Sequence, residues 1–315
     1  MLTDSFIEEQ VHRRIEKLMG NRFEITVVSP DAQFAQTCIQ EAIEEIKRIE
    51  SLLTTYRPDS TTARINDHAG IAPVQVEKEV FDLIERSIRI SKLTQGAFDI
   101  TYGSIDKSLW NFDKTMTSLP DAATCKKMVR LINYNNIILD RKNLTVMLKE
   151  KGMRIGFGGI GKGYAADKAK ALLAGKGIES GIVNAAGDLA CWGFQPDGKP
   201  WTVGIADPDR KEVPFSYMNI SNLAIATSGN YEKFVTINGK KYSHTIDPAT
   251  GLPVTGIKSV SVISPIAELS DALATPLSIM GIRAGLDMIN QMNGIACIII
   301  DDNNTVYTSE NISII

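Results

Sequence analysis

Cysteine is scarce in this sequence, and the few cysteines are scattered. Four occur in 315 residues, far apart and without any C-x-x-C pair. This spacing argues against a structural zinc site and against a disulfide-dense scaffold, and it suits a reducing compartment. Cys38 and Cys297 fall in apolar patterns, so we expect both to be inert core residues.

Long apolar runs and an excess of one charge are also absent. No apolar stretch approaches the length of a membrane span, and a formal net charge of −3 gives no reason to expect a nucleic-acid partner. Residues 1–9 contain no basic segment, apolar segment or lipid-acceptor cysteine. We therefore expect the chain as given to be cytoplasmic. If an export signal had been removed, the alternative is a membrane-anchored periplasmic lipoprotein.

Apolar periodicity predicts an α+β fold. Helical spacing predicts helices over 34–55, 79–93, 120–132, 162–174, 266–280 and 283–291, with Pro120 in the first turn of the third. Short apolar or alternating runs predict strands over 23–29, 137–139, 144–148, 182–184, 201–205, 223–226, 234–237, 241–244, 260–263, 295–300 and 305–308. Hairpins and clustered helices outnumber strand–helix–strand units, so we expect a largely antiparallel sheet packed with helices.

The run GFGGIGKG at 156–163 is the most informative stretch. Glycines allow backbone N–H groups to approach an anion, and Lys162 adds a positive charge, so the run predicts a phosphorylated ligand. A P-loop would need Ser or Thr where Gly163 stands. A dinucleotide-binding strand would be apolar, but residues 149–155 are largely charged; Glu179, near the spacing of a ribose ligand, keeps this alternative open. A glycine-rich turn that only caps a helix is the third interpretation.

Four further segments carry groups that chemistry could use. GAFDIT at 96–101 offers an aromatic wall and a carboxylate, or only a helix end with Phe98 and Trp110 in the core. NAAGD at 184–188 allows close approach of a ligand or forms a plain turn. His244 is one of three histidines and is either catalytic or a surface residue. Asp271 and Thr275 lie four apart on a predicted helix, so their oxygens share one face; such a pair suits Mg²⁺ or is ordinary helix surface.

Taken in order, these segments resemble one family. The segments are KLMG (17–20), GAFD (96–99), GGIGKGYAAD (158–167), NAAGD (184–188), ATSG (226–229), HTIDP (244–248) and DALAT (271–275). Together they resemble the ApbE-type FAD:protein FMN transferases, from about Met19 to beyond Thr275. The resemblance implies an ApbE-like, T-fold-related architecture over residues 1–315. We expect one domain, or two subdomains with the FAD site between them.

The resemblance also implies a reaction. Such enzymes split FAD at its pyrophosphate and transfer FMN to a Ser or Thr of a D-G-x-[ST]-G-A-[ST]-like segment, releasing AMP. By resemblance, His244 is the base that takes the acceptor proton. The remaining implied residues are the Mg²⁺ contacts Asp271, Thr275 and the Gly159 carbonyl; Lys162 at a phosphate; Met19, Tyr56, Ala97, Phe98 and Asp99 at the flavin or adenine; and Thr245 at the cofactor.

One position departs from the family pattern. The family usually begins its glycine run with an aspartate, where this chain has Gly156. Asp99 or Asp188 would have to supply that contact, and the number of metal ions stays open between one and two. The alternative functions are a Mg²⁺-dependent FAD pyrophosphatase that gives FMN and AMP, a catalytically silent FAD-binding protein, and a dinucleotide-binding oxidoreductase.

Overall fold

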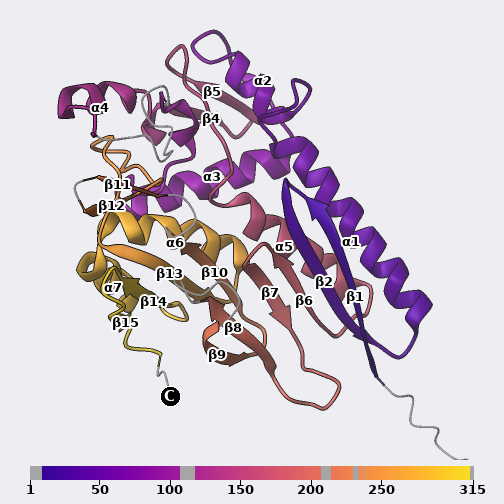
Figure 1. Cartoon of the computed structure of the whole chain (residues 1–315). Coiled ribbons are helices and arrows are strands. Elements are labelled where there is room, and N and C mark those ends of the chain that lie inside the picture. Colours follow the sequence, from indigo (N-terminus) through magenta and orange to yellow (C-terminus); the bar gives the residue numbers. More distant parts are fainter. Residues whose placement is uncertain (1–8, 107–117, 207–213, 230–233, 238, 313–315) are drawn as a thin grey trace, which may run out of the picture. The chain divides into compact units, whose positions relative to one another are not determined.

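The computed structural model describes residues 9–106, 118–206, 214–229, 234–237 and 239–312 (Figure 1). The chain divides into two compact units. Unit 1 comprises Met1–Glu50, Lys162–Ala226 and Ile263–Ser270, and unit 2 comprises Ser51–Gly161, Thr227–Val262 and Asp271–Ile315. The expectation of a single domain over 1–315 stays a prediction.

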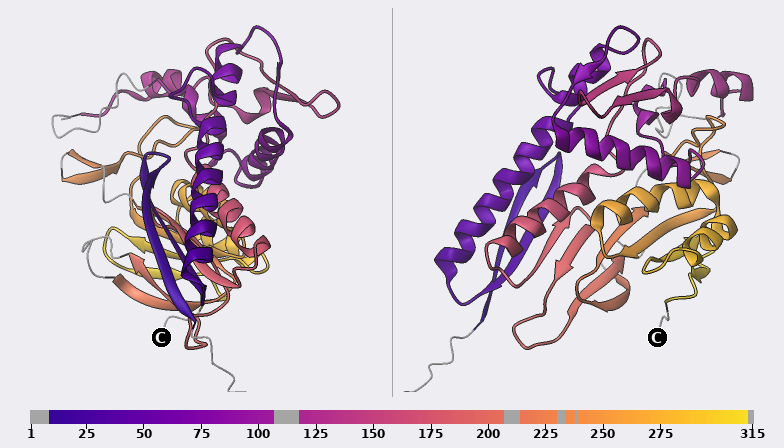
Figure 2. Two further views of the ribbon diagram at one scale, coloured as in Figure 1. Left: turned by 90° about the vertical axis from the view of Figure 1, so that its right-hand side faces the viewer. Right: turned by 180° about the vertical axis from the view of Figure 1, so that it is seen from behind.

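Unit 1 is built on antiparallel strands. They are β1 (Gln10–Leu18), β2 (Asn21–Ser29), β6 (Ser180–Ala185) and β7 (Asp188–Trp192), in the order β1-β2-β6-β7, and the first residues of β10 (Ala224–Gly229) pair with β7. Helices α1 (Ala32–Leu53) and α5 (Gly161–Gly175) lie over one face of these strands (Figure 2, right). A separate antiparallel pair is formed by β8 (Trp201–Ala206) and β9 (Pro214–Ile220).

The core of unit 1 follows from the two-residue period of β2. Phe23, Ile25 and Val27 alternate with more exposed neighbours and are buried, as expected for a strand with one covered face. Gly181 on β6 pairs with Val27, and a Cβ there would lie only 2.5 Å from the Thr26 carbonyl oxygen. The close spacing at this point therefore requires glycine.

Unit 2 holds most of the remaining elements. Its helices are α2 (Thr61–Asp67), α3 (Lys78–Leu93), α4 (Ala122–Met128), α7 (Ile282–Asn290) and most of α6 (Ala267–Met280), with short 3₁₀ turns η1 (Ile100–Ser104) and η2 (Tyr134–Asn136). One small sheet has the order β3 (Val74–Gln75), β5 (Thr145–Leu148), β4 (Ile137–Asp140). The hairpin β11 (Phe234–Ile237)–β12 (Lys240–Ser243) stands apart, and β13 (Ile257–Ser264), β14 (Ala296–Asp301) and β15 (Val306–Thr308) are neighbours in that order.

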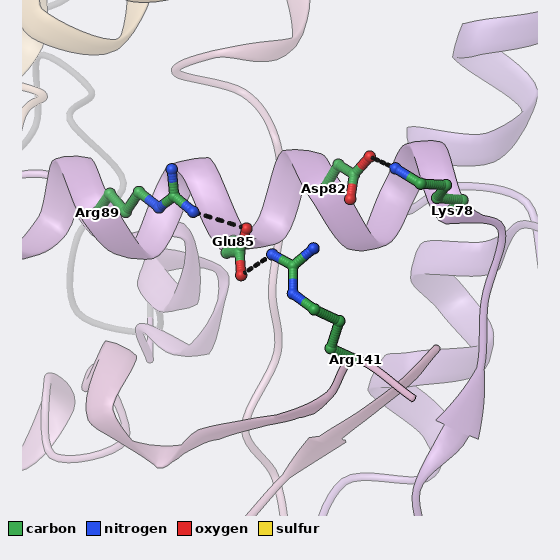
Figure 3. Close-up of polar contacts among 5 residues, drawn as sticks. All are labelled: Lys78, Asp82, Glu85, Arg89 and Arg141. Atoms are coloured by element: carbon green, nitrogen blue, oxygen red, sulfur yellow. Dashed lines mark hydrogen bonds and ion pairs between the residues drawn. The ribbon is translucent and has the colours of Figure 1, made fainter. Parts of the chain in front are cut away.

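An arginine joins the small sheet of unit 2 to α3. Arg141, in the turn between β4 and β5, forms an ion pair with Glu85 (Figure 3). Its guanidinium lies 5.9 Å from the centre of the buried Phe81 ring. Arg89 pairs with the same carboxylate from the next turn of α3, at 2.9 Å. The cation over the ring and the shared carboxylate hold the hairpin against the helix.

The predicted fold class is confirmed, because the sheets are largely antiparallel and mixed with helices. The expectation for 120–132 is wrong in its bounds, since α4 covers only Ala122–Met128. The Asp121 carboxylate accepts hydrogen bonds from the N–H groups of Ala123 and Thr124, so this residue caps the helix and Pro120 stands outside it. Four strands and one helix were not predicted from the sequence: β1, β3, β7, β9 and α2.

The predicted core cysteines are buried. Burial raises the pKa of Cys38, and it raises that of Cys297 to about 11, so both thiols are inert at neutral pH. Trp110 lies outside the described residues. No described helix combines the length and apolar character that a membrane crossing needs.

Candidate active site

A pocket of about 620 Å³ lies within unit 2. Its walls come from five parts of the chain, around residues 97–105, 156–159, 228, 244–246 and 275–279. A volume of this size is typical of small-molecule sites. Segments that are far apart in sequence therefore meet at one cavity.

Seven residues predicted from the sequence line this pocket: Ala97, Phe98, Asp99, Gly159, His244, Thr245 and Thr275. Asp271 lies one turn before Thr275 on α6, is 6% exposed, and is not among the lining residues. Tyr56 is 94% exposed and does not line the pocket either. Met19 and Lys162 belong to unit 1. The ligand roles given to all of these residues stay predictions.

Phe98 forms the aromatic wall that its position after α3 suggested. It is 7% exposed, and its N–H donates to the Thr94 hydroxyl at 3.0 Å. A Cβ on Gly159 would lie 3.7 Å from the Phe98 ring, so the glycine run passes close to this ring. The wall therefore joins an apolar face to a stretch of bare backbone, as a flat, phosphorylated ligand would need.

Asp99 is engaged by the protein itself. One carboxylate oxygen accepts from the N–H and the hydroxyl of Thr101, at 2.8 and 2.7 Å, and the other accepts from the N–H of Tyr134 at 2.8 Å. Burial raises the pKa of Asp99, and these hydrogen bonds act in the opposite direction. Through these hydrogen bonds Asp99 holds η1 and the start of η2 together beside the pocket.

The glycine run is a loop that leads into α5. Asn66 holds the residue before it, with its amide donating to the Ile155 carbonyl at 3.0 Å and its oxygen accepting from the Ile155 N–H at 2.7 Å. Residues 149–160, all described, contain no strand. A dinucleotide-binding fold requires a strand there, within a parallel sheet, so that alternative is wrong for this chain. The P-loop alternative fails at Gly163, as the sequence indicated.

His244 follows β12 in a loop that is closely tied to its surroundings. Ser243 N–H donates to the Val254 carbonyl, and the Ser243 hydroxyl accepts from the Thr245 N–H at 2.9 Å. The loop returns through Gly251, where φ is +73° and a Cβ would lie 2.2 Å from the Cys125 carbonyl oxygen. Only glycine fits this approach to α4. His244 itself is exposed and lines the pocket.

Oxygen atoms gather on the α6 side of the pocket. The Thr275 hydroxyl donates to the Ser228 hydroxyl at 3.2 Å, and both residues line the cavity. Pro276 follows inside α6 and has no N–H, which leaves the carbonyl four residues earlier without its helical donor. Hydroxyl, carbonyl and carboxylate oxygens are the donors that Mg²⁺ prefers. Among the described residues, no three His, Cys, Asp or Glu side chains gather as a metal cluster.

Unit 1 contains the other two predicted ligand contacts. The Lys162 ammonium, in the first turn of α5, forms an ion pair with the buried Asp188 carboxylate. Asp188 opens β7 just after a turn in which Ala186 and Gly187 both have positive φ, at 55° and 100°. Met19 also has a positive φ, and its N–H donates to Glu50 at 2.8 Å. Lys162 and Met19 are thus each held by a carboxylate of unit 1.

The model of the ApbE family matches residues 19–299. The chain belongs to the ApbE family. A FAD:protein FMN transferase of Klebsiella pneumoniae is 30% identical over 304 residues, covering 96% of this chain and 93% of the relative. Similar coverage is found for a FAD:protein FMN transferase of Treponema pallidum, with 29% identity over 96% of this chain and 87% of the relative.

Solved ApbE structures agree with this assignment. The crystal structure of the ApbE protein of Thermotoga maritima matches with a TM-score of 0.85 and 30% identity, covering 96% of this chain and 97% of that chain. Flavinyl transferase ApbE of Pseudomonas stutzeri matches with a TM-score of 0.84 and 26% identity, covering 98% and 97%. The ApbE fold therefore extends over nearly the whole chain.

Several lining residues of this ApbE-family protein were not predicted from the sequence, among them Tyr102, Ser228 and Ile279. Ser228 belongs to the ATSG segment that carried the family resemblance, although no role was given to it. Tyr102 stands three residues after Asp99, within η1. The Tyr102 hydroxyl accepts a hydrogen bond from the N–H of Ile246, 144 positions away in the sequence. Local spacing gives no indication of such a contact.

Proposed function

We propose that this ApbE-family protein transfers FMN from FAD to a Ser or Thr hydroxyl of a target protein and releases AMP. In this reaction the acceptor oxygen bonds to the flavin-side phosphorus. The bond from that phosphorus to the bridging oxygen breaks, and AMP leaves with the bridging oxygen. The observation that carries the proposal is one pocket lined by an aromatic wall, a glycine run and His244, in a chain whose relatives are FAD:protein FMN transferases.

His244 is the proposed general base. It lines the pocket and is exposed, so a protein hydroxyl could reach it. An imidazole nitrogen would take the hydroxyl proton as the oxygen attacks, a contribution typically worth roughly 10²–10⁴-fold in rate. Phe98, Ala97 and Asp99 would form the wall against the flavin or adenine, and Thr245 would contact the same ligand. Met19 and Tyr56 are proposed as further contacts, and Lys162 would pair with a phosphate.

We also propose that Mg²⁺ assists the reaction. Asp271, Thr275 and the Gly159 carbonyl would hold it, and the donors fit because all are oxygens and one is a buried carboxylate. A bound divalent ion neutralises charge on the phosphate oxygens during cleavage. The ion pair with Asp188 fixes the position of the Lys162 ammonium in the first turn of α5. The proposed acceptor is a D-G-x-[ST]-G-A-[ST]-like segment.

The test is intact-mass analysis of an acceptor containing D-G-x-T-G-A-T after incubation with the protein, FAD and Mg²⁺. The expected result is a gain of one FMN on the threonine, abolished by EDTA. An unmodified acceptor with AMP and free FMN in solution would indicate the pyrophosphatase instead. Intact FAD, bound but not cleaved, would indicate a silent FAD-binding protein.

Replacing His244 by alanine tests the base. We expect His244→Ala to lower the transfer rate by roughly 10²-fold or more while FAD affinity changes little, because general-base catalysis acts on the chemical step. His68→Ala is the matched control, since His68 is exposed and its ring hydrogen-bonds to the Arg64 carbonyl of α2. Transfer at the wild-type rate by the His244 variant would remove this residue from the mechanism.

Replacing Asp271 by alanine tests the metal contact. We expect Asp271→Ala to lose transfer activity and its Mg²⁺ dependence together, as a titration of rate against Mg²⁺ would measure. Asp287→Ala removes an exposed carboxylate from α7 and serves as the control. A variant at 271 that is active and responds to Mg²⁺ like the wild type would move the metal site elsewhere.

A further inference from the structure

Tyr102 connects one wall of the pocket to the loop that carries His244. The residue lies in η1 and lines the pocket. Its hydroxyl oxygen accepts a hydrogen bond from the N–H of Ile246, at 3.2 Å. The two residues are 144 positions apart in the sequence. This contact therefore joins the wall to a backbone group two residues after the proposed base.

The N–H that donates to the Tyr102 hydroxyl belongs to a buried residue. Ile246 is 1% exposed and belongs to a hydrophobic cluster with Cys125, Met128 and Val129. A buried N–H that loses its acceptor pays the full cost of desolvation, and the backbone shifts to recover a partner. A shift at Ile246 would move His244, because only Thr245 lies between them.

The neighbouring N–H groups are satisfied from within the loop. The N–H of Thr245 donates to the Ser243 hydroxyl, and that of Val254 donates to the Thr245 carbonyl at 2.9 Å. The N–H of Ile246 donates instead to Tyr102, which belongs to a different element, η1, on another wall of the pocket. It thus ties the loop that carries His244 to the wall formed by Phe98 and Asp99. Burial also raises the pKa of the Tyr102 hydroxyl, so it stays neutral at physiological pH.

We propose that Tyr102 is a positioning residue for the transfer reaction, and that its hydroxyl holds the His244–Ile246 segment through the Ile246 N–H. This inference rests on the proposed transfer function and adds a residue to it. Tyr102 acts on the placement of His244, so its loss should impair the chemical step more than FAD binding. A displacement of a catalytic group by about 1 Å can cost on the order of 10²-fold in rate.

The test compares Tyr102→Phe, which removes only the hydroxyl, with the wild type in the FMN-transfer assay. We expect kcat to fall by about tenfold or more while KM for FAD stays within about twofold. Amide hydrogen exchange followed by mass spectrometry gives a readout independent of activity. Peptides that contain 244–246 should exchange faster in the variant, while α1 and the β1–β2 strands should be unchanged.

Ile132→Val is the control for a purely structural effect. Ile132 packs against the same hydrophobic cluster as Tyr102 and has no polar group in its side chain. The inference is overturned if Tyr102→Phe keeps the wild-type kcat, if Ile132→Val lowers kcat equally, or if exchange at 244–246 does not change. If the wild type itself transfers no FMN, the proposed function fails, and the exchange measurement alone decides whether Tyr102 holds the segment.

Discussion

At the scale of single residues, Asp99 shows how a buried carboxylate shapes the pocket wall. It accepts three hydrogen bonds from Thr101 and Tyr134. Asp99→Asn would keep one oxygen and turn an amide NH₂ toward a donor, leaving at least one N–H without an acceptor. We expect a loss of about 1–3 kcal/mol in the free energy of unfolding, measured by urea denaturation. An unchanged urea midpoint for Asp99→Asn would contradict this prediction. Asp287→Asn changes a carboxylate at an exposed site and is the control.

Residues with a chemical signature in their own neighbourhood could be predicted from the sequence. Phe98, His244 and Thr275 were found because each lies in a short segment with a recognisable composition, and the structure brings them to one pocket. The hydrogen bond from Ile246 to Tyr102 and the ion pair between Lys162 and Asp188 could not be found that way. Periodicity and spacing report on local structure, whereas these contacts depend on how distant segments fold together.

At the scale of elements, the joint between α3 and the β4–β5 hairpin should depend on pH. The hydrogen bond from Arg141, and the charges of Arg141 and Arg89, lower the pKa of Glu85. A carboxylate whose pKa is lower in the folded than in the unfolded protein stabilises the folded state. This stabilisation is fully present at pH values above the unfolded-state pKa of about 4.3, and it is lost as the pH falls through the folded-state pKa. Arg141→Gln should therefore lower the urea midpoint at pH 7, with a difference from wild type that narrows below about pH 4.

The size of that effect and its control follow from exposure. The Glu85 side chain is 26% exposed and the Arg141 side chain is 61% exposed, so solvent screens the ion pair. The change in the urea midpoint should therefore be small. Lys142→Gln removes the same charge from the next residue of the turn and should leave the pH profile unchanged. A difference between Arg141→Gln and wild type that is constant from pH 7 to pH 3 would contradict the role given to Glu85.

Elements with strong apolar periodicity could be predicted, and polar ones could not. The pattern along 34–55 gave α1 to within about two residues at each end. Strand β1 was missed because His12, Arg13, Arg14, Glu16 and Lys17 occupy five of its nine positions. It pairs with β2 on one side and stands first in the strand order, where charged side chains are typical because they discourage pairing with other chains.

At the scale of the whole molecule, the division into two units raises the question of cooperativity. The boundaries between the units fall inside five regular elements, which are α1, α5, β10, β13 and α6. A helix or strand cannot lose half its residues without weakening the hydrogen bonds of the rest. We therefore expect the two units to unfold in one transition, although each is compact by itself.

The tryptophans allow this to be tested. Trp192 and Trp201 are buried in unit 1, so in a Trp110→Phe background fluorescence reports on that unit alone. Gly251→Ala destabilises unit 2, because Gly251 has a positive φ and a Cβ would overlap the Cys125 carbonyl; we expect a loss of about 2 kcal/mol or more. Gly158→Ala, where a Cβ meets nothing within 4 Å, is the control.

With one cooperative transition, the urea midpoints from fluorescence and from circular dichroism fall together in the Gly251 variant. A fluorescence midpoint that stays at the wild-type value while the dichroism midpoint falls would mean that unit 1 unfolds independently.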